Sequence, residues 1–326
     1  MGVTLPVTVA VCTFRRPEEL SRALASLTSQ EPAAAELLVV DNSPDQSALA
    51  LVGRKFPRVR AVAEPVPGLD FARNRALAEA THDIVLFLDD DAVAQPGWVE
   101  ASARALLDDD RVGVSTGRVE PMSLESEGQK LFEANGGFSR GSHRVRLPAD
   151  AATLLHGRKA PLIAWAVSVG SGCSLAVRRD LVQRIGGFDP ALDMGAALPG
   201  GGDHDIMWRV LQSGYDVVYE PRAVALHEHR RGLPEAETQI VGHQRALVAL
   251  LTKQVIQTGG RRRWSVAGFL AWRLVKPGVR LLRRLGKKDP LPAPLLFRMW
   301  AHCWLGLIAY PRARRLAQQR AARSSA

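Results

Sequence analysis

Short apolar runs alternate with helical patterns along the first 90 residues of the chain. The apolar runs lie at residues 7–14, 36–41, 59–64 and 84–88, and each has the length of a strand. A helix is expected to begin at Pro17, because Leu20, Leu24 and Leu27 follow it at helical spacing. Two further helices are expected over 45–56 and 68–80. Strands and helices that alternate through short loops predict βαβ units and a parallel sheet.

Polar residues end all four predicted strands, and they are Thr13, Asp41, Glu64 and Asp89. The last strand, Ile84–Leu88, is apolar throughout, which predicts burial on both faces in the centre of the sheet. Asp89-Asp90-Asp91 follow it at the edge where such sheets bind ligands. Asp89 and Asp91 point the same way in an extended chain and suit Mg²⁺ or Mn²⁺ bound to a diphosphate. The alternative is a solvated acidic turn, the role expected for the same tripeptide at 108–110.

The second half of the chain has a less regular pattern. Residues 120–146 are rich in Gly, Ser and charge, and are interpreted as an acceptor loop or a simple crossover. Residues 165–177 predict a strand that Gly170-Ser171-Gly172 interrupts, which indicates a bulge or close approach to a ligand. A short helix over 179–185, strands over 216–221 and 223–230, and a helix over 235–257 are expected to follow.

Charge separates a basic tail from the rest of the chain. Residues 251–326 hold 17 of the 43 Lys and Arg residues and one of the 33 acidic residues, so their formal charge is +16 and that of residues 1–250 is −6. The hydrophobic content of 46% is ordinary for a folded protein. Cys12, Cys173 and Cys303 form no CxxC pair, which argues against a disulfide scaffold or a zinc cluster. No basic segment precedes the first strand, so we expect no secretory signal and a cytoplasmic location.

The tail, residues 256–326, is expected to be helical. Its cations Arg273, Lys276, Arg280, Arg283 and Arg284 fall on one helical stripe beside an apolar surface, and Pro277 is expected to kink the helix. Residues 291–310 are apolar but contain prolines and charges, which suits an interfacial helix better than a membrane span. The tail could therefore bind an anionic membrane surface from the inner face, or pack on the rest of the chain or on a second subunit. Nucleic acid is a weaker alternative.

Four motifs in the first half resemble those of a known family. CTFRRP at 12–17, VVDNSP at 39–44, GLDFARNRAL at 68–77 and LFLDDDA at 86–92 are similar, in order and spacing, to the nucleotide-binding half of a family 2 glycosyltransferase with the GT-A fold. The resemblance implies a Rossmann-like α/β domain over 1–255, with a nucleotide-sugar half at 1–119 and an acceptor half at 120–255. It also implies a nucleotide-diphosphate sugar donor, an acceptor with a free hydroxyl, and transfer with inversion.

The same resemblance implies roles for individual residues. The nucleotide is expected to contact Thr13, Phe14, Arg16, Asp41, Arg73, Asn74, Asp89 and Asp90. Asp41 reads the base in this interpretation, although a turn or capping role is its ordinary use before Asn-Ser-Pro. Asp91 and Asp89, joined by His227 in preference to His229, are expected to hold Mn²⁺ or Mg²⁺. Asp70 stands where many relatives carry a small residue, and its role stays open.

The predicted catalytic base follows Gly200-Gly201-Gly202. The resemblance assigns the base to Asp203, with Asp205 in support and Arg209 as their partner. Gly202 occupies the position where the family often has Glu, so Asp205 is the alternative base if the register differs by a residue. A nucleotidyltransferase of similar fold is the alternative enzyme, because it uses similar Asp-held metals.

Overall fold

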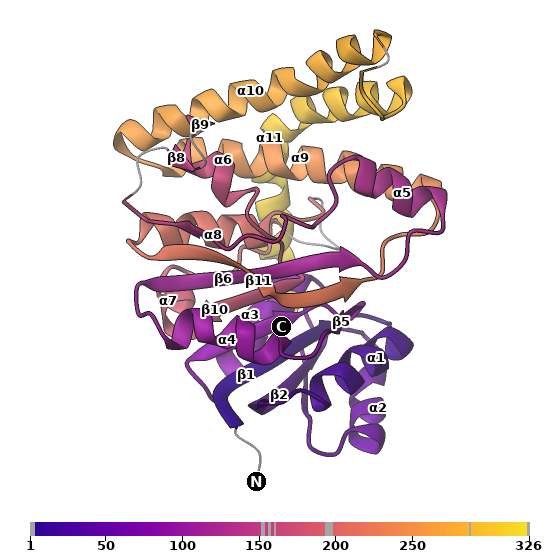
Figure 1. Ribbon diagram of the computed structural model, residues 1–326, viewed down its shortest axis with the longest axis vertical. Coiled ribbons are helices and arrows are strands. Elements are labelled where there is room, and N and C mark those ends of the chain that lie inside the picture. Colours follow the sequence, from indigo (N-terminus) through magenta and orange to yellow (C-terminus); the bar gives the residue numbers. More distant parts are fainter. Residues whose placement is uncertain are drawn as a thin grey trace.

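The computed structural model describes residues 4–150, 154–155, 158–159, 161–192, 198–286 and 288–324 (Figure 1). A nine-stranded sheet crosses the middle of the molecule. Its strands are β1 (Thr4–Thr13), β2 (Ala33–Asp41), β3 (Arg60–Ala63), β4 (Ile84–Leu88), β5 (Ala92–Ala94), β6 (Val112–Pro121), β7 (Val145–Leu147), β10 (Ser174–Arg178) and β11 (Asp216–His227). Two short strands, β8 (Leu154–Leu155) and β9 (Arg158–Lys159), pair separately.

The main sheet has the order β3-β2-β1-β4-β10-β6-β11-β5, and β7 pairs with β11. Strands β1, β2, β3, β4, β6 and β11 run in one direction, whereas β5, β7 and β10 run in the other. The prediction of a mostly parallel α/β sheet is therefore confirmed. The carboxyl ends of β1, β4, β6 and β11 lie at one edge, which brings Thr13, Asp89 and His227 to the same side of the molecule.

Helices cover both faces of this sheet. They are α1 (Pro17–Thr28), α2 (Ser47–Lys55), α3 (Leu69–Glu79), α4 (Trp98–Leu107), α5 (Glu127–Ala134), α6 (Leu162–Ala166), α7 (Arg179–Arg184) and α8 (Gly202–Gln212). Alternation along β1 separates two cores, since Val9 and Val11 pack with α1 and α4 while Ala10 and Cys12 pack with α3 and α8. One face is thus closed by α1, α2 and α4, and the other by α3, α6, α7 and α8.

Three long helices form a further layer beyond α8, as Figure 1 shows. They are α9 (Leu233–Gln257), α10 (Gly260–Leu285) and α11 (Ala293–Ser324), and each packs against the other two. From the far end of α10, α11 runs back across α9 until Arg320 Nη1 reaches the carbonyl of Pro67 at 3.3 Å. The tail therefore packs on the rest of the chain, which was one of the alternatives left open by its sequence.

Three sequence predictions about elements were wrong. Residues 165–177 are not one interrupted strand: α6 occupies part of this segment, and β10 begins only at Ser174. The strands expected at 216–221 and 223–230 are the single strand β11, with an irregular register between Glu220 and Val224. Residues 120–146 contain α5, and its capping box of Ser126 and Gln129 was a signal in the sequence that the interpretation missed.

Pro277 lies inside α10, and the helix continues past it to Leu285. A proline removes the hydrogen bond to the carbonyl four residues earlier, here that of Arg273. The thiol of Cys303 on α11 donates to that carbonyl at 3.7 Å, and Trp300 Nε1 donates to the carbonyl of Leu274 at 3.0 Å. Two side chains of α11 thus donate hydrogen bonds to backbone carbonyls in the turn before Pro277, including the carbonyl that the proline leaves without its helical donor.

Candidate active site

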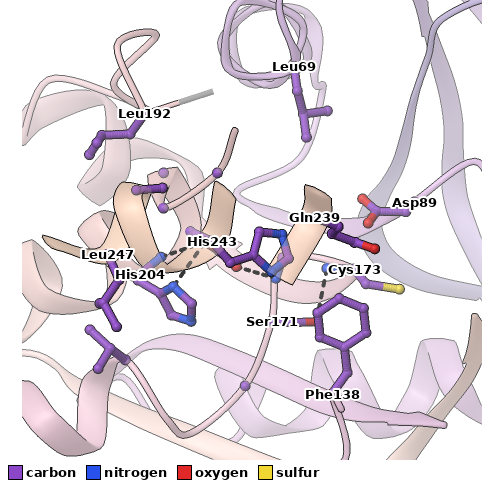
Figure 2. Close-up of a pocket in the computed structure, with 18 of the residues that line it drawn as sticks. Leu69, Asp89, Phe138, Ser171, Cys173, Leu192, His204, Gln239, His243 and Leu247 are labelled. Atoms are coloured by element: carbon purple, nitrogen blue, oxygen red, sulfur yellow. Dashed lines mark hydrogen bonds and ion pairs between the residues drawn. The ribbon is translucent and has the colours of Figure 1, made fainter. Parts of the chain in front are cut away.

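A cavity of about 810 Å³ lies at the carboxyl edge of the sheet, a size typical of small-molecule sites. Its walls come from the ends of β1 and β4, the start of α3, the 170–173 loop and the start of α8. Helices α9, α10 and α11 also contribute side chains. Figure 2 shows Asp89 and Cys173 at one end of this cavity and Leu192 and Leu247 at the other.

The acidic triplet lies on this cavity and is bound to the first strand-to-helix turn. Asp90 accepts a hydrogen bond from the hydroxyl of Thr13 at 2.9 Å. Arg16 Nη1 donates to Asp90 at 2.9 Å and to Asp91 at 2.6 Å. Burial raises the pKa of Asp90 to about 6 despite the charge of Arg16. The turn after β1 and the acidic triplet, more than 70 residues apart in the sequence, are therefore joined by hydrogen bonds and ion pairs.

The residues predicted to hold a metal lie close together. His227 Nε2 is 3.3 Å from Asp91 Oδ1, and ligand atoms of Asp89, Cys173 and His227 all lie within 4.8 Å of one another. Burial opposes the charged forms, but His227 and Arg16 lower the pKa of Asp91, while Asp91 and Asp89 raise the pKa of His227. Carboxylate oxygens and an imidazole nitrogen suit Mn²⁺ or Mg²⁺.

Cys173 was missed as a member of this cluster. Burial and the nearby charges of Asp89 and Asp91 raise the pKa of its thiol, so it is protonated at neutral pH, and a thiol is a poor ligand for hard cations. Of the predicted ligands, Asp89 and His227 therefore belong to this cluster, and Asp91 adjoins it through His227 Nε2. His229 is turned away from it, since its Nδ1 faces His227 Nδ1 at 3.0 Å and its Nε2 faces Glu133 at 2.9 Å.

Asp203 faces the cavity from the start of α8. Its Oδ2 accepts from the backbone N–H of Gly172 at 2.7 Å, and its Oδ1 accepts from that of His204 at 2.8 Å. Burial alone would raise the pKa of Asp203, but His204, Arg73 and the two N–H groups outweigh it and hold the pKa below its usual value. A Cβ at Gly172 would lie 2.6 Å from Arg73 Nη2 and 3.1 Å from the Asp203 Cβ, so this glycine permits the approach.

Asp205, the second predicted catalytic residue, does not line the cavity. It is fully buried and accepts from Arg209 Nε at 2.7 Å and from Gln254 Nε2 at 2.6 Å, and it pairs with Lys253 Nζ at 2.8 Å. Arg209 contacts Asp205 as predicted and also donates to backbone carbonyls at 185 and 187. The bonds of Asp205 with Gln254 and Lys253 anchor α8 to α9, so Asp205 has the contacts of a structural carboxylate.

Two other predicted donor residues have their side chains engaged elsewhere. Asp41 is buried, and its carboxylate accepts from the backbone N–H groups of Ser43 at 2.9 Å and Ala48 at 2.8 Å, which is the capping role that its sequence context left open. Asn74 donates to and accepts from the backbone of Phe188 at 2.9 and 2.8 Å. By contrast, Phe14 is 46% exposed and lines the cavity.

Asp70 and Gly202 form a complementary pair across the cavity wall. Asp70 is buried and lies 3.4 Å from Arg73, which also reaches Asp89 at 3.5 Å. A Cβ added to Gly202 would lie only 1.9 Å from Asp70 Oδ2. The carboxylate of Asp70 therefore fills the space that a side chain at position 202 would take, and the two departures from the family pattern noted in the sequence meet at one point.

Several cavity residues from the second half were not predicted. Phe138 and Arg140 follow α5, and His243 comes from α9. Burial lowers the pKa of His243 to about 4, so its imidazole is neutral at pH 7. Arg273 and Lys276 were assigned to a surface stripe, but they line the cavity from α10. Their inward direction depends on how α10 packs on α9, which helical spacing alone does not determine.

The fold and the cavity, which holds both the acidic triplet at a strand end and Asp203, are those of an enzyme of the transferase class. Residues 8–186 match the profile of "Glycosyl transferase family 2", more than half of the chain, so the chain belongs to that family.

Two curated glycan-related proteins are similar to parts of the chain. The chain is 26% identical over 219 residues to a pre-mycofactocin glycosyltransferase of Mycobacterium tuberculosis, which covers 65% of this chain and 41% of that protein. It is 37% identical over 102 residues to the succinoglycan biosynthesis protein ExoM of Rhizobium meliloti, covering 29% of this chain and 33% of that one. The chain therefore spans less than half the length of these curated relatives.

The fold is similar to that of the mannosyltransferase PcManGT from Pyrobaculum calidifontis, solved in complex with GDP-Man and Mn²⁺. The TM-score is 0.56 at 19% identity, over 95% of this chain and 86% of that one. This likeness extends through the helical C-terminal region and supports the GT-A fold predicted from the sequence.

Proposed function

We propose that this glycosyltransferase moves a sugar from a nucleotide-diphosphate donor to an acceptor hydroxyl with inversion at the anomeric carbon. The observation that carries the proposal is the position of Asp203 on the same cavity as the Asp89–Asp91 triplet. The triplet can hold a metal ion beside the departing diphosphate, while Asp203 can accept the proton of the attacking hydroxyl. The family match favours sugar transfer over nucleotidyl transfer.

Asp203 has the properties of a general base in this proposal. Its lowered pKa keeps it ionised at neutral pH, and two backbone N–H groups fix the direction of its carboxylate. As the acceptor oxygen bonds to the anomeric carbon, the bond to the diphosphate oxygen breaks and the acceptor proton passes to Asp203. The diphosphate leaves with the electron pair of the broken bond.

Asp91, Asp89 and His227 would hold a divalent ion beside the donor. When bound, such an ion neutralises charge on a leaving diphosphate. Arg16 bridges Asp90 and Asp91 and holds both carboxylates at the edge of the cavity. Arg73 contacts Asp89 and the Gly172 carbonyl, and thereby links the donor edge to the loop that supports Asp203.

A panel of UDP, GDP and dTDP sugars tests the proposal by thermal shift with and without Mn²⁺. One donor series is expected to stabilise the protein, and Mn²⁺ is expected to increase the shift, because binding to the folded state raises stability by mass action. Turnover is then measured with that donor. If no nucleotide sugar stabilises the protein in the presence of Mn²⁺ or Mg²⁺, the proposed donor class is wrong.

We also propose that the outward face of α10 and α11 meets an anionic membrane surface. Among the described residues, no helix is long and apolar enough to cross a bilayer. Exposed apolar side chains nevertheless recur along both helices: Trp264, Trp272, Val275 and Leu282 on α10, and Phe297, Trp304, Leu305 and Ile308 on α11. Exposed apolar patches next to Arg261–Arg263 are typical of interfacial helices.

Vesicle sedimentation tests this surface. The full chain is expected to sediment with vesicles that contain anionic lipid and to release as salt rises, because the attraction is screened over about 8 Å at physiological ionic strength. Trp264→Ser should weaken this binding without changing turnover. A chain that ignores anionic vesicles at low salt but shifts a DNA duplex would reverse the choice of partner.

A further inference from the structure

The inner face of α10 places three cations against the cavity. Arg273, Lys276 and Arg280 are spaced by three and four residues, so they share one side of the helix, and all three line the cavity. The exposed apolar residues Trp272 and Val275 alternate with them in sequence and lie on the outward side. The middle of α10, residues 272–280, therefore directs its charges inward and apolar side chains outward, the reverse of an ordinary surface helix.

These three cations are not equally neutralised. Arg280 pairs with Asp289 through hydrogen bonds of 2.8 and 3.1 Å and also donates to Asn135. Arg273 Nη2 donates to the neutral Gln244 at 2.6 Å, while its buried Nε has no partner among the described residues. Lys276 likewise has no hydrogen-bond or ion-pair partner in the described part of the chain. On α10, Arg273 and Lys276 thus line the cavity without a counter-ion among the described residues.

Burial makes this arrangement unfavourable for the protein alone. Burial, together with the charges of Arg273 and Arg280, lowers the pKa of Lys276 to about 8. A buried charge without a counter-ion costs free energy that a bound anion would recover. The unpaired cations therefore mark a place where the cavity is suited to an anionic ligand.

The donor diphosphate belongs at the opposite wall. Arg16 and Arg73 are engaged by Asp90, Asp91, Asp70 and Asp89 at the strand edge, where the metal ligands lie. The charged neighbours that shift the pKa of Lys276 are instead the cations of α10 itself. Apolar side chains of Leu247, Phe269 and Met299 also line the cavity beside these cations. The cavity thus has an acidic wall and a cationic wall, made by different parts of the chain.

We infer that Arg273 and Lys276 bind a phosphate group carried by the acceptor. A phosphate monoester carries about −1.5 to −2 charges at pH 7, which matches two unpaired cations, whereas a carboxylate would leave one of them unpaired. Arginine provides a fork for phosphate oxygens and lysine a point charge. The inference rests on the proposed function only in naming the bound molecule as the acceptor. The anion site itself is independent of that function.

Calorimetric titration of the full chain with inorganic phosphate, without divalent metal and at constant ionic strength, tests the site. Lys276→Gln is expected to weaken phosphate binding at least about 10-fold, and Lys276→Arg to retain most of it. Arg283→Gln is the matched control, because Arg283 is exposed on the same helix and does not line the cavity. If the wild type does not bind phosphate, or if Lys276→Gln and Arg283→Gln weaken it equally, the inference is wrong.

Two further measurements distinguish a lipid-borne from a soluble phosphate, and an acceptor site from a donor site. Dodecyl phosphate that binds more tightly than glycerol 3-phosphate, with dodecyl maltoside as the uncharged control, supports a lipid-borne acceptor; the reverse order supports a soluble one. Donor binding is measured in the same variants with the nucleotide-sugar panel. Loss of donor affinity in Lys276→Gln would assign the cations to the donor and overturn the inference. Failure of every donor to bind, with phosphate binding intact, would instead contradict only the proposed function.

Discussion

Asp203→Asn is the most direct test of the proposed base. The substitution keeps the size of the side chain but replaces one carboxylate oxygen with an NH₂ group. Both oxygens of Asp203 accept from backbone N–H groups, at 2.7 Å from Gly172 and 2.8 Å from His204. One of these bonds is therefore lost, and two donors then face each other. Local stability should fall by about 1–3 kcal/mol, because a buried donor is left without an acceptor.

The expected effect on catalysis is larger than this loss of stability. Removal of a general base typically lowers the rate by about 100-fold to 10,000-fold, and we expect Asp203→Asn to lose at least about 100-fold in kcat. Donor affinity and the stabilisation by Mn²⁺ should stay nearly unchanged, since Asp203 is not among the proposed metal ligands. The assay is initial-rate transfer with the donor found by thermal shift, at a temperature well below the Tm of the variant.

Asp205→Asn is the matched control for this experiment. It removes a buried charge from Arg209 and Lys253, so it should cost about 3–5 kcal/mol of stability while the folded fraction keeps most of its kcat. The two variants are thus predicted to separate catalysis from stability. If Asp203→Asn remains active while folded Asp205→Asn is inactive, the base is Asp205 and the sequence register around Gly202 differs from our interpretation.

Three other changes have definite expected outcomes. Asp91→Ala should abolish the stabilisation by Mn²⁺ and the turnover, whereas Asp109→Ala, from the second acidic triplet, should leave both intact; full activity in EDTA would contradict the first. Gly202→Ala should destabilise the fold by about 1–3 kcal/mol through its contact with Asp70, and Asp70→Ala should recover part of that loss in a double-mutant cycle. Burial alone would raise the pKa of Glu36, but hydrogen bonds lower it to about 2, so its contribution is present above pH 4.5 and is lost as the pH falls toward 2. Urea unfolding should show Glu36→Gln less stable by about 1–2 kcal/mol at pH 7, with no difference near pH 2.

The sequence predicted the elements of the first half of the chain well because their signals are local. Its strands are short apolar runs, such as Ile84–Leu88, and α1 has a clear helical periodicity in Leu20, Leu24 and Leu27. The antiparallel strand β10 could not be placed in the same way. Its position between β4 and β6 depends on pairs of residues that are 59 to 94 positions apart in the sequence, and the glycines at 170 and 172 concealed its start.

The sequence predicted those site residues that lie in motifs at strand ends. It missed those whose direction depends on how the helices pack. Thr13, Arg16, Asp91 and His227 meet because parallel strands share an edge, and each of them was predicted. Asp41 has the turn and capping bonds that its place before Asn-Ser-Pro indicates, rather than a free carboxylate in the cavity. The sequence showed that the cations of α10 share one side of a helix, but we expected that side to face solvent. Which way it faces depends on the elements that pack against α10.

In the proposed function, residues 256–326 take part in selecting the acceptor, because α10 and α11 form part of the cavity wall. The family match ends at residue 186, yet Phe269, Lys276 and Met299 line the same cavity as the acidic triplet. A truncation after residue 255, the boundary that composition suggests, would remove a wall of the site and uncover the apolar side of α9. Chimaeras that exchange residues 256–326 between relatives should instead change acceptor choice and keep the donor, so that acceptor range can diverge in this family without any change in residues 1–119.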